Sequence, residues 1–186
     1  MLTDQQQTHW HTFGFVTFRN LFTETEVETI NDEFEAGLAT EQTNYSDGEL
    51  PLSFSGLGSS TPFLSVLPED PRFLEAAEQI WGDDVISSGS MGQRFTNSNT
   101  YWHPDLVDGS HETKDNHIPG VKFACYLDAL KPDSGALRLI SGSHLSPLHD
   151  ELFAIGLKGD ESPYLKNAGV TIRDIPAYVW ASDPTD

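Results

Sequence analysis

Hydrophobic spacing along the chain changes at Gly82, and this change limits the folds open to the protein. Before Gly82, apolar residues recur three or four positions apart, as on one face of a helix. Thr3 or Asp4 would cap a short first helix that ends at Gly14. The capping box TETE, at residues 23–26, would start a second helix. The predicted buried face of this second helix holds Val27, Ile30, Phe34 and Leu38.

A third helix is predicted to begin at Asp70 and Pro71 and to end at Gly82, because a capping Asp, a first-turn Pro and a closing Gly mark helix boundaries. Its inward residues would be Phe73, Leu74, Ala77, Ile80 and Trp81. Residues 13–18 are predicted to form a short strand. Residues 40–62 are rich in Ser, Gly, Thr and Pro and are predicted to form a long loop.

After Gly82, short strand-like runs alternate with turn residues. These runs are residues 85–95, 100–106, 120–130, 135–141 and 170–180. Helices followed by strands indicate an α+β or mainly β fold, in the form of a sandwich or barrel with a helical cover. We expect one domain over residues 1–186, with a helical part at about 1–82 and a strand-rich part at about 83–186.

The chain is strongly acidic, with 10 Lys and Arg against 29 Asp and Glu and a net charge of −19. Nucleic acids and anionic membranes bind through basic patches, so this charge argues against both as partners. It also disfavours a polyanionic substrate such as an acyl-CoA. We expect a well-solvated acidic surface and a small-molecule substrate.

Three features favour a cytoplasmic location. No run of 18 apolar residues could span a membrane, and the N-terminus lacks the basic start and apolar centre of a signal peptide. Cys125 is the only cysteine, so the chain has no internal disulfide, which fits a reducing compartment. None of these features sets the oligomeric state.

Two His-x-acid triplets are candidate metal sites. His103 and Asp105 lie in the strand-like run TYWHPDL, where residues two apart project to the same face. They could supply two of the three ligands of a 2-His-1-carboxylate iron site. His149 and Glu151 lie in a helix-like run over residues 146–156, where residues two apart diverge, so we expect them to be surface residues.

Two other interpretations of His103 stay open on the residues alone. It could be a loop histidine that is hydrogen-bonded to a nearby carboxylate. It could instead bind zinc with His111 and His117, although these three lack a compact ligand spacing.

The order of these features resembles the phytanoyl-CoA dioxygenase family. Residues 11–38 resemble its N-terminal pattern of a helix, a glycine turn, a short strand and a capped helix. TYWHPDL resembles its W-H-x-D metal motif, and residues 124–144, ACYLDALKPDSGALRLISGSH, resemble its strand, turn, strand and closing P-G-S-H. The three motifs occur in the family's order and cover most of residues 11–144.

The resemblance implies a double-stranded β-helix, also called a jelly roll or cupin-like fold, behind N-terminal helices. It implies an Fe(II)- and 2-oxoglutarate-dependent dioxygenase, an oxidoreductase that hydroxylates a small-molecule metabolite with O₂ and releases succinate and CO₂. His103 and Asp105 would then be the catalytic metal ligands. Gln93 could face the cosubstrate, while Lys122 and Arg138 could line the pocket or be ordinary strand-edge charges. Tyr101 and Trp102 are expected to pack.

The chain departs from the family at its C-terminal end. The family's third ligand is a histidine well beyond the GSH motif, with an arginine some ten residues later that pairs with 2-oxoglutarate. Here no histidine follows His149, and Arg173 precedes the place where the third ligand should come. We therefore expect an incomplete jelly roll, with the third histidine beyond Asp186 and with His144 as the fallback ligand. Residues 1–186 alone would then be inactive.

Two other functions stay open. A catalytically silent jelly-roll binding domain would be favoured if the natural chain ended at Asp186. A halogenase of the same fold is less expected, because such enzymes replace the acidic ligand with a small residue and this chain keeps Asp105.

Overall fold

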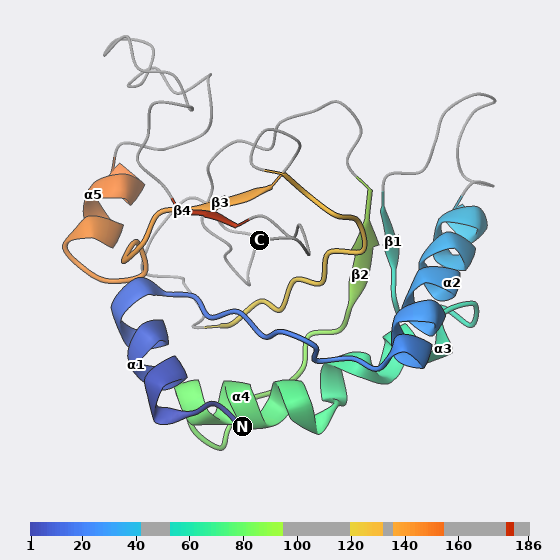
Figure 1. Cartoon of the computed structure of the whole chain (residues 1–186), viewed down its shortest axis with the longest axis horizontal. Helices are drawn as coiled ribbons and strands as arrows, with labels where there is room; N and C mark the ends of the chain where they lie inside the picture. Colours follow the sequence, from blue (N-terminus) through green and yellow to red (C-terminus); the bar gives the residue numbers. More distant parts are fainter. Residues whose placement is uncertain (42–52, 95–119, 132–135, 155–177, 181–186) are drawn as a thin grey trace, which may run out of the picture. The chain divides into compact units, whose positions relative to one another are not determined.

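The computed structural model describes residues 1–41, 53–94, 120–131, 136–154 and 178–180 (Figure 1). The chain divides into two compact units. One unit contains Met1 and residues 17–98, and the other contains residues 2–16 and 99–186. Each unit is described by itself below. The predicted ligands His103 and Asp105 lie outside the described residues.

In the first unit, helix α2 (Glu24–Glu41) begins at the predicted capping box. The Thr23 backbone N–H donates to Glu26 Oε2 at 2.7 Å, and the Glu26 N–H donates to Thr23 Oγ1 at 3.3 Å. Of the predicted buried face, Ile30 and Leu38 are buried. Val27 was wrongly placed there and is 41% exposed, because it lies in the first turn of the helix, before the buried positions begin.

Two residues that were not predicted to be buried, Glu33 and Gly37, complete the inward face of α2. Glu33 is 9% exposed, and its carboxylate accepts hydrogen bonds from the Phe63 and Leu64 backbone N–H groups at 2.9 and 2.8 Å. These donors belong to the first turn of helix α3 (Pro62–Val66), a short helix missed in the sequence. A carboxylate on α2 therefore caps a neighbouring helix about 30 residues away in sequence.

Strands β1 (Ser53–Ser55) and β2 (Met91–Gln93) form an antiparallel pair in which Phe54 lies opposite Gly92. The prediction of a loop over residues 40–62 is thus wrong for β1, because Phe54 is 4% exposed and anchors the strand. The Phe54 ring lies 5.5 Å from the Phe34 ring in a T-shaped contact. This aromatic pair is one of the contacts between α2 and the sheet.

Two glycines make room for the Phe54 ring. A Cβ on Gly37 of α2 would lie 2.4 Å from the ring, and a Cβ on Gly92 of β2 would lie 2.0 Å from it. Both distances are shorter than a Cβ atom can approach a neighbouring side chain. The ring therefore fills the space between α2 and β2, and only glycine fits at both positions.

The turn η2 (Leu67–Glu69) leads into helix α4 (Pro71–Trp81). The predicted ends are confirmed, since Asp70 caps the helix by accepting the Arg72 N–H at 2.8 Å and Gly82 ends it. The buried residues are Phe73, Ala76 and Ala77. Trp81 was wrongly predicted to face inward and is 49% exposed, because it lies in the last turn, beyond the buried residues.

Arg72 joins the starts of α2 and α4. Its guanidinium donates to Glu26 Oε1 and to Asp70 Oδ2, both at 2.7 Å, and to the Leu21 carbonyl at 2.9 Å. Hydrogen bonds from Arg72 lower the pKa of Glu26 to about 2 and also lower the pKa of Asp70. Two local helix caps are thereby linked into one charged network.

In the second unit, helix α1 (Asp4–Phe13) has the predicted boundaries. Thr3 accepts the Gln6 N–H at 3.2 Å, and Gly14 ends the helix with a left-handed φ of 82°. The strand predicted over residues 13–18 is wrong. Phe13 closes α1, and residues 14–18 are all half-buried, without the alternating exposure of a strand that has one buried face.

Strand β3 (Leu137–Leu139) pairs antiparallel with β4 (Tyr178–Trp180), with Arg138 opposite Val179. Helix α5 (Leu148–Ala154) follows β3, as predicted. The strand predicted over residues 120–130 is wrong, because the alternation of exposed and half-buried side chains stops after Ala124. The described strands form two two-stranded sheets, so the double-stranded β-helix stays a prediction.

Candidate functional site

The predicted iron ligands cannot be placed beside the described residues. His103 and Asp105, with Tyr101 and Trp102, belong to residues 95–119, and Arg173 belongs to residues 155–177. His111 and His117, the other ligands of the zinc alternative, also belong to residues 95–119. Within the described part of the chain, no three His, Cys, Asp or Glu side chains converge as a metal site. The assignment of His103 and Asp105 stays a prediction.

Strand β2 ends ten residues before His103 in the sequence, and its two faces differ. Gly92 is buried and faces the Phe54 ring, as the 2.0 Å approach of a Cβ at Gly92 requires. Met91 and Gln93 flank Gly92 on the strand and therefore project to the opposite face, where both are exposed. Gln93 thus lies on the face of the sheet turned away from α2.

Arg94, which follows β2, is engaged with α2. Its guanidinium forms an ion pair with Glu35 and lies 5.7 Å from the centre of the Phe34 ring. Sequence reasoning did not single out Arg94, although its place two residues after the inward-facing Gly92 indicates the same face. Arg94 is therefore a contact between β2 and α2, and Gln93 is the polar side chain of this segment that faces the other way.

The two cationic pocket candidates differ in their structural setting. Arg138 is the central residue of β3, as predicted, and is half-buried between Leu137 and Leu139. Lys122 was expected on a strand, but the structure has no strand there, and its side chain is exposed. Arg138 is therefore the better placed of the two to line an interior.

His144, the fallback ligand, lies against the end of α1. Its Nε2 atom is 3.3 Å from the His11 carbonyl oxygen. A Cβ at Gly14 would lie 2.4 Å from its Nδ1 atom. The His144 ring centre is 6.4 Å from that of Trp10. Both ring nitrogens thus face the backbone of the C-terminal turn of α1.

His149 lies on α5, as predicted, but it is half-buried and not the surface residue that we expected, because its ring contacts the preceding turn. Its Nδ1 atom lies 3.1 Å from the Ser143 carbonyl oxygen, so the imidazole holds the turn that precedes its own helix. The backbone N–H of His149 also donates to the Leu145 carbonyl at 2.8 Å. These contacts give His149 a structural role at the start of α5.

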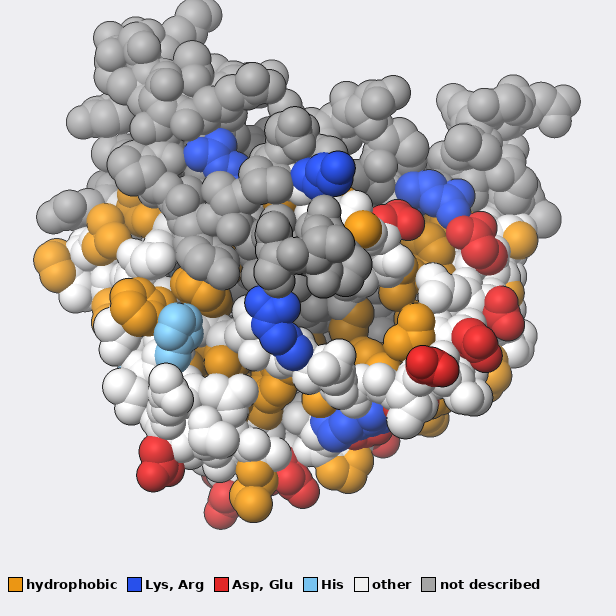
Figure 2. All heavy atoms as spheres, viewed as in Figure 1, with side chains coloured by type: hydrophobic (Ala, Val, Ile, Leu, Met, Phe, Trp, Pro, Cys, Tyr) orange, Lys and Arg blue, Asp and Glu red, His pale blue; other side chains and the backbone are white. Residues whose placement is uncertain are grey.

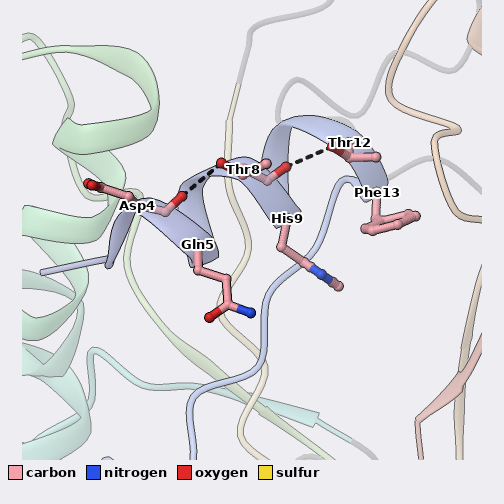
Figure 3. A pocket seen from close by; sticks show the side chains of 6 residues that line it. All are labelled: Asp4, Gln5, Thr8, His9, Thr12 and Phe13. Atoms are coloured by element: carbon pink, nitrogen blue, oxygen red, sulfur yellow. Dashed lines mark hydrogen bonds between the residues drawn. The ribbon is translucent and has the colours of Figure 1, made fainter.

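An open groove runs along one side of α1 (Figure 3). Its lining residues within the described part of the chain come from this helix and are Asp4, Gln5, Thr8, His9, Thr12 and Phe13. The hydroxyls of Thr8 and Thr12 donate to the carbonyl oxygens four residues earlier, both at 2.8 Å, and are thereby occupied. A groove made by a single helix encloses too little of a small molecule to be a substrate site.

Figure 2 shows acidic side chains at several separate places on the visible face, with Lys and Arg side chains also present. This distribution agrees with the solvated acidic surface that the net charge of −19 predicts. None of the described helices has the length and apolar character needed to cross a membrane.

Comparison with known proteins connects these observations. A family model described as phytanoyl-CoA dioxygenase matches residues 10–161, which include His103, Asp105, Gln93 and His144. Ectoine dioxygenases from Bordetella bronchiseptica and Bordetella parapertussis are each 28% identical to the chain over 141 residues, which is 70% of the chain and 46% of the relative. The chain thus spans about half the length of these curated relatives. No solved structure matches. Because the family model covers most of the chain, the protein belongs to the phytanoyl-CoA dioxygenase family.

Proposed function

We propose that the protein is an Fe(II)- and 2-oxoglutarate-dependent oxygenase that hydroxylates a small molecule. The observation that carries the proposal is the family match over residues 10–161, which contains the W-H-x-D motif at residues 102–105. The matched relatives carry the name ectoine dioxygenase. Since the chain covers 46% of those relatives, the activity is proposed for the protein that contains this chain.

His103 and Asp105 would hold the iron. The donor chemistry fits, because a neutral imidazole nitrogen and a carboxylate oxygen are two of the three donors of a facial Fe(II) site. Bound Fe(II) would supply the oxidation of a C–H bond by O₂, coupled to the conversion of 2-oxoglutarate to succinate and CO₂. The side chains of the protein would set the geometry of the site and exclude bulk water from it.

Gln93 would contact the cosubstrate. The support is its position on the exposed face of β2, opposite the buried Gly92 and ten residues before His103. A glutamine amide both donates and accepts hydrogen bonds, so it can orient a carboxylate or a keto oxygen without adding charge. Arg94, the next residue along the chain, lies on the opposite face and is paired with Glu35.

The third iron ligand is proposed to be a histidine outside residues 1–186. The relatives extend well beyond the matched length, since the alignment covers only 46% of each. His144, the fallback within the chain, has its two ring nitrogens against the end of α1, and this geometry supports a different role for it.

The test uses the full-length natural protein that contains this chain. His103→Ala and Asp105→Ala should each abolish succinate formation and lower bound Fe(II) to background, because each removes one of three ligands. Ectoine, on which the relatives are named as acting, is the first substrate to assay. 2-Oxoglutarate turnover without substrate is the second assay, because it needs no knowledge of the substrate.

His111→Ala is the matched control. It should keep both iron and activity, whereas loss of the metal in this variant would favour the zinc site with His103 and His117. Undiminished succinate formation by Asp105→Ala would overturn the iron assignment. Retained iron without any turnover of 2-oxoglutarate would instead indicate a silent binding domain.

A comparison of lengths tests the third ligand. Residues 1–186 alone should bind Fe(II) weakly and form no succinate, because two ligands hold the ion less firmly than three. A missing partner for the 2-oxoglutarate carboxylate would cost about 1.5–3 kcal/mol, roughly a tenfold to hundredfold loss of affinity. If the shorter chain matches the longer one, a residue within 1–186 completes the site.

A further inference from the structure

The C-terminal end of α1 is capped from a distant part of the chain. The last turn of any helix leaves four carbonyl oxygens without a partner inside the helix. In α1, the Trp10 carbonyl accepts the Gly14 N–H at 2.8 Å. The Phe13 carbonyl accepts the Gly142 N–H at 3.0 Å, and the His11 carbonyl faces His144 Nε2 at 3.3 Å. Two of the four carbonyls are thus served by residues about 130 positions away.

Gly142 and His144 can do this together because the turn that carries them is itself fixed. The Ser143 N–H donates to the Ile140 carbonyl, and the Leu145 N–H donates to the Gly142 carbonyl, both at 3.1 Å. Gly142 has a φ of 78°, in the left-handed region that glycine adopts without strain. His149 Nδ1 supports the turn from α5 at the Ser143 carbonyl.

Close approach at Gly14 seats the His144 ring on the helix end. Gly14 has a φ of 82°, and a Cβ there would lie 2.4 Å from Nδ1 and 2.8 Å from Cγ of His144. A carbonyl oxygen can only accept, so His144 Nε2 must carry the proton that it donates to His11. Nε2 is then used as a donor and Nδ1 faces Gly14, which leaves neither nitrogen directed at a metal.

We propose that Gly142 and His144 form a latch that caps α1, and that His144 is a positioning residue rather than an iron ligand. The turn follows β3 directly, so the latch joins α1 to the strand that carries Arg138 and fixes their spacing. The spacing of two residues in G-S-H then has a physical reason, because it directs two donors to one helix end. The inference that His144 is not an iron ligand rests on the proposed function, whereas the latch does not.

Hydrogen exchange of the α1 amides tests the latch. His144→Phe keeps a ring of similar size but removes the donor, and His144→Gln places an amide N–H at about the reach of Nε2. His144 is exposed, so the lost hydrogen bond should speed exchange in the last turn of α1 by about twofold to tenfold in the Phe variant. The Gln variant should stay near the wild-type rate.

Ser141→Ala is the matched control, since Ser141 is an exposed residue of the same segment. It should leave α1 exchange unchanged. Equal rates in the wild type and His144→Phe would overturn the latch. Equally fast exchange in His144→Gln and His144→Phe would also overturn it, because the donor would then not matter.

Bound Fe(II) in the full-length natural protein tests whether His144 is an iron ligand. His144→Phe and His144→Gln should both keep the wild-type iron content, whereas His103→Ala should lose it. Loss of iron in both folded His144 variants would show that His144 is a ligand and would overturn its assignment as a positioning residue. If the wild-type protein binds no iron, the proposed function fails, and the exchange measurement still decides the latch.

Discussion

Removing the Glu33 carboxylate should destabilise the first unit, because this side chain of α2 caps the start of α3. Glu33 is 9% exposed, and its two oxygens accept the Phe63 and Leu64 N–H groups at 2.9 and 2.8 Å. Pro62, the first residue of α3, has no N–H to satisfy. The carboxylate therefore serves the two donors at the start of this helix that need a partner.

The cost follows from the hydrogen bonds lost. Glu33→Ala removes both acceptors and leaves two backbone donors in a part-buried place, which should cost about 2–3 kcal/mol. Glu33→Gln keeps one good acceptor and loses the charge, which should cost about 1–2 kcal/mol. For a chain of this length, 1 kcal/mol corresponds to a Tm change of about 2–4 °C. Glu33→Ala should therefore lower Tm by about 4–12 °C.

Thermal unfolding followed by circular dichroism measures the effect. Glu28→Ala is the control, because Glu28 is an exposed glutamate of the same helix, and its substitution should change stability by less than about 0.5 kcal/mol. The order of Tm should be wild type, Gln variant and Ala variant. Equal Tm values for Glu33→Ala and Glu28→Ala would refute the capping of α3 by Glu33.

Three further predictions concern Arg72, Gly92 and Asp105. Arg72→Met should be less stable than wild type at neutral pH, and urea unfolding should show this difference shrinking as the pH falls from about 4.5 to about 2. The reason is that Arg72 lowers the pKa of Glu26, so the ion pair is present above the usual carboxyl pKa and is lost when Glu26 is protonated. A stability difference that stays constant over this pH range would contradict the prediction. Gly92→Ala should cost about 1–3 kcal/mol, because its Cβ would overlap a ring, whereas Gly58→Ala meets its nearest atom at 3.5 Å and should be tolerated in the same unfolding assay. With Asp105 present, the full-length natural protein should hydroxylate its substrate even in high chloride, and a chlorinated product in the mass spectrum would contradict the role of Asp105.

The sequence by itself determined helices α1, α2 and α4 and most of their ends, although it did not predict the short helix α3. Thr3 with Gln6, residues 23–26, and Asp70 with Arg72 are caps made between residues two or three apart. Such contacts form wherever the chain turns into a helix, so the local pattern is enough to predict them. The order of the motifs was likewise enough to indicate the family, which the match over residues 10–161 confirmed.

Only the tertiary structure decided which polar residues serve the fold. A glutamate is usually a surface residue, yet Glu33 is buried because α3 brings two backbone donors to it. His144 lies in a recognisable motif, but its contact with α1 joins residues 133 positions apart. The strands predicted at residues 13–18 and 120–130 did not form, although their composition favours strands. A strand needs a neighbouring strand, and a buried polar group needs a hydrogen-bond partner. Both come from segments distant in the sequence, so the local pattern cannot predict them.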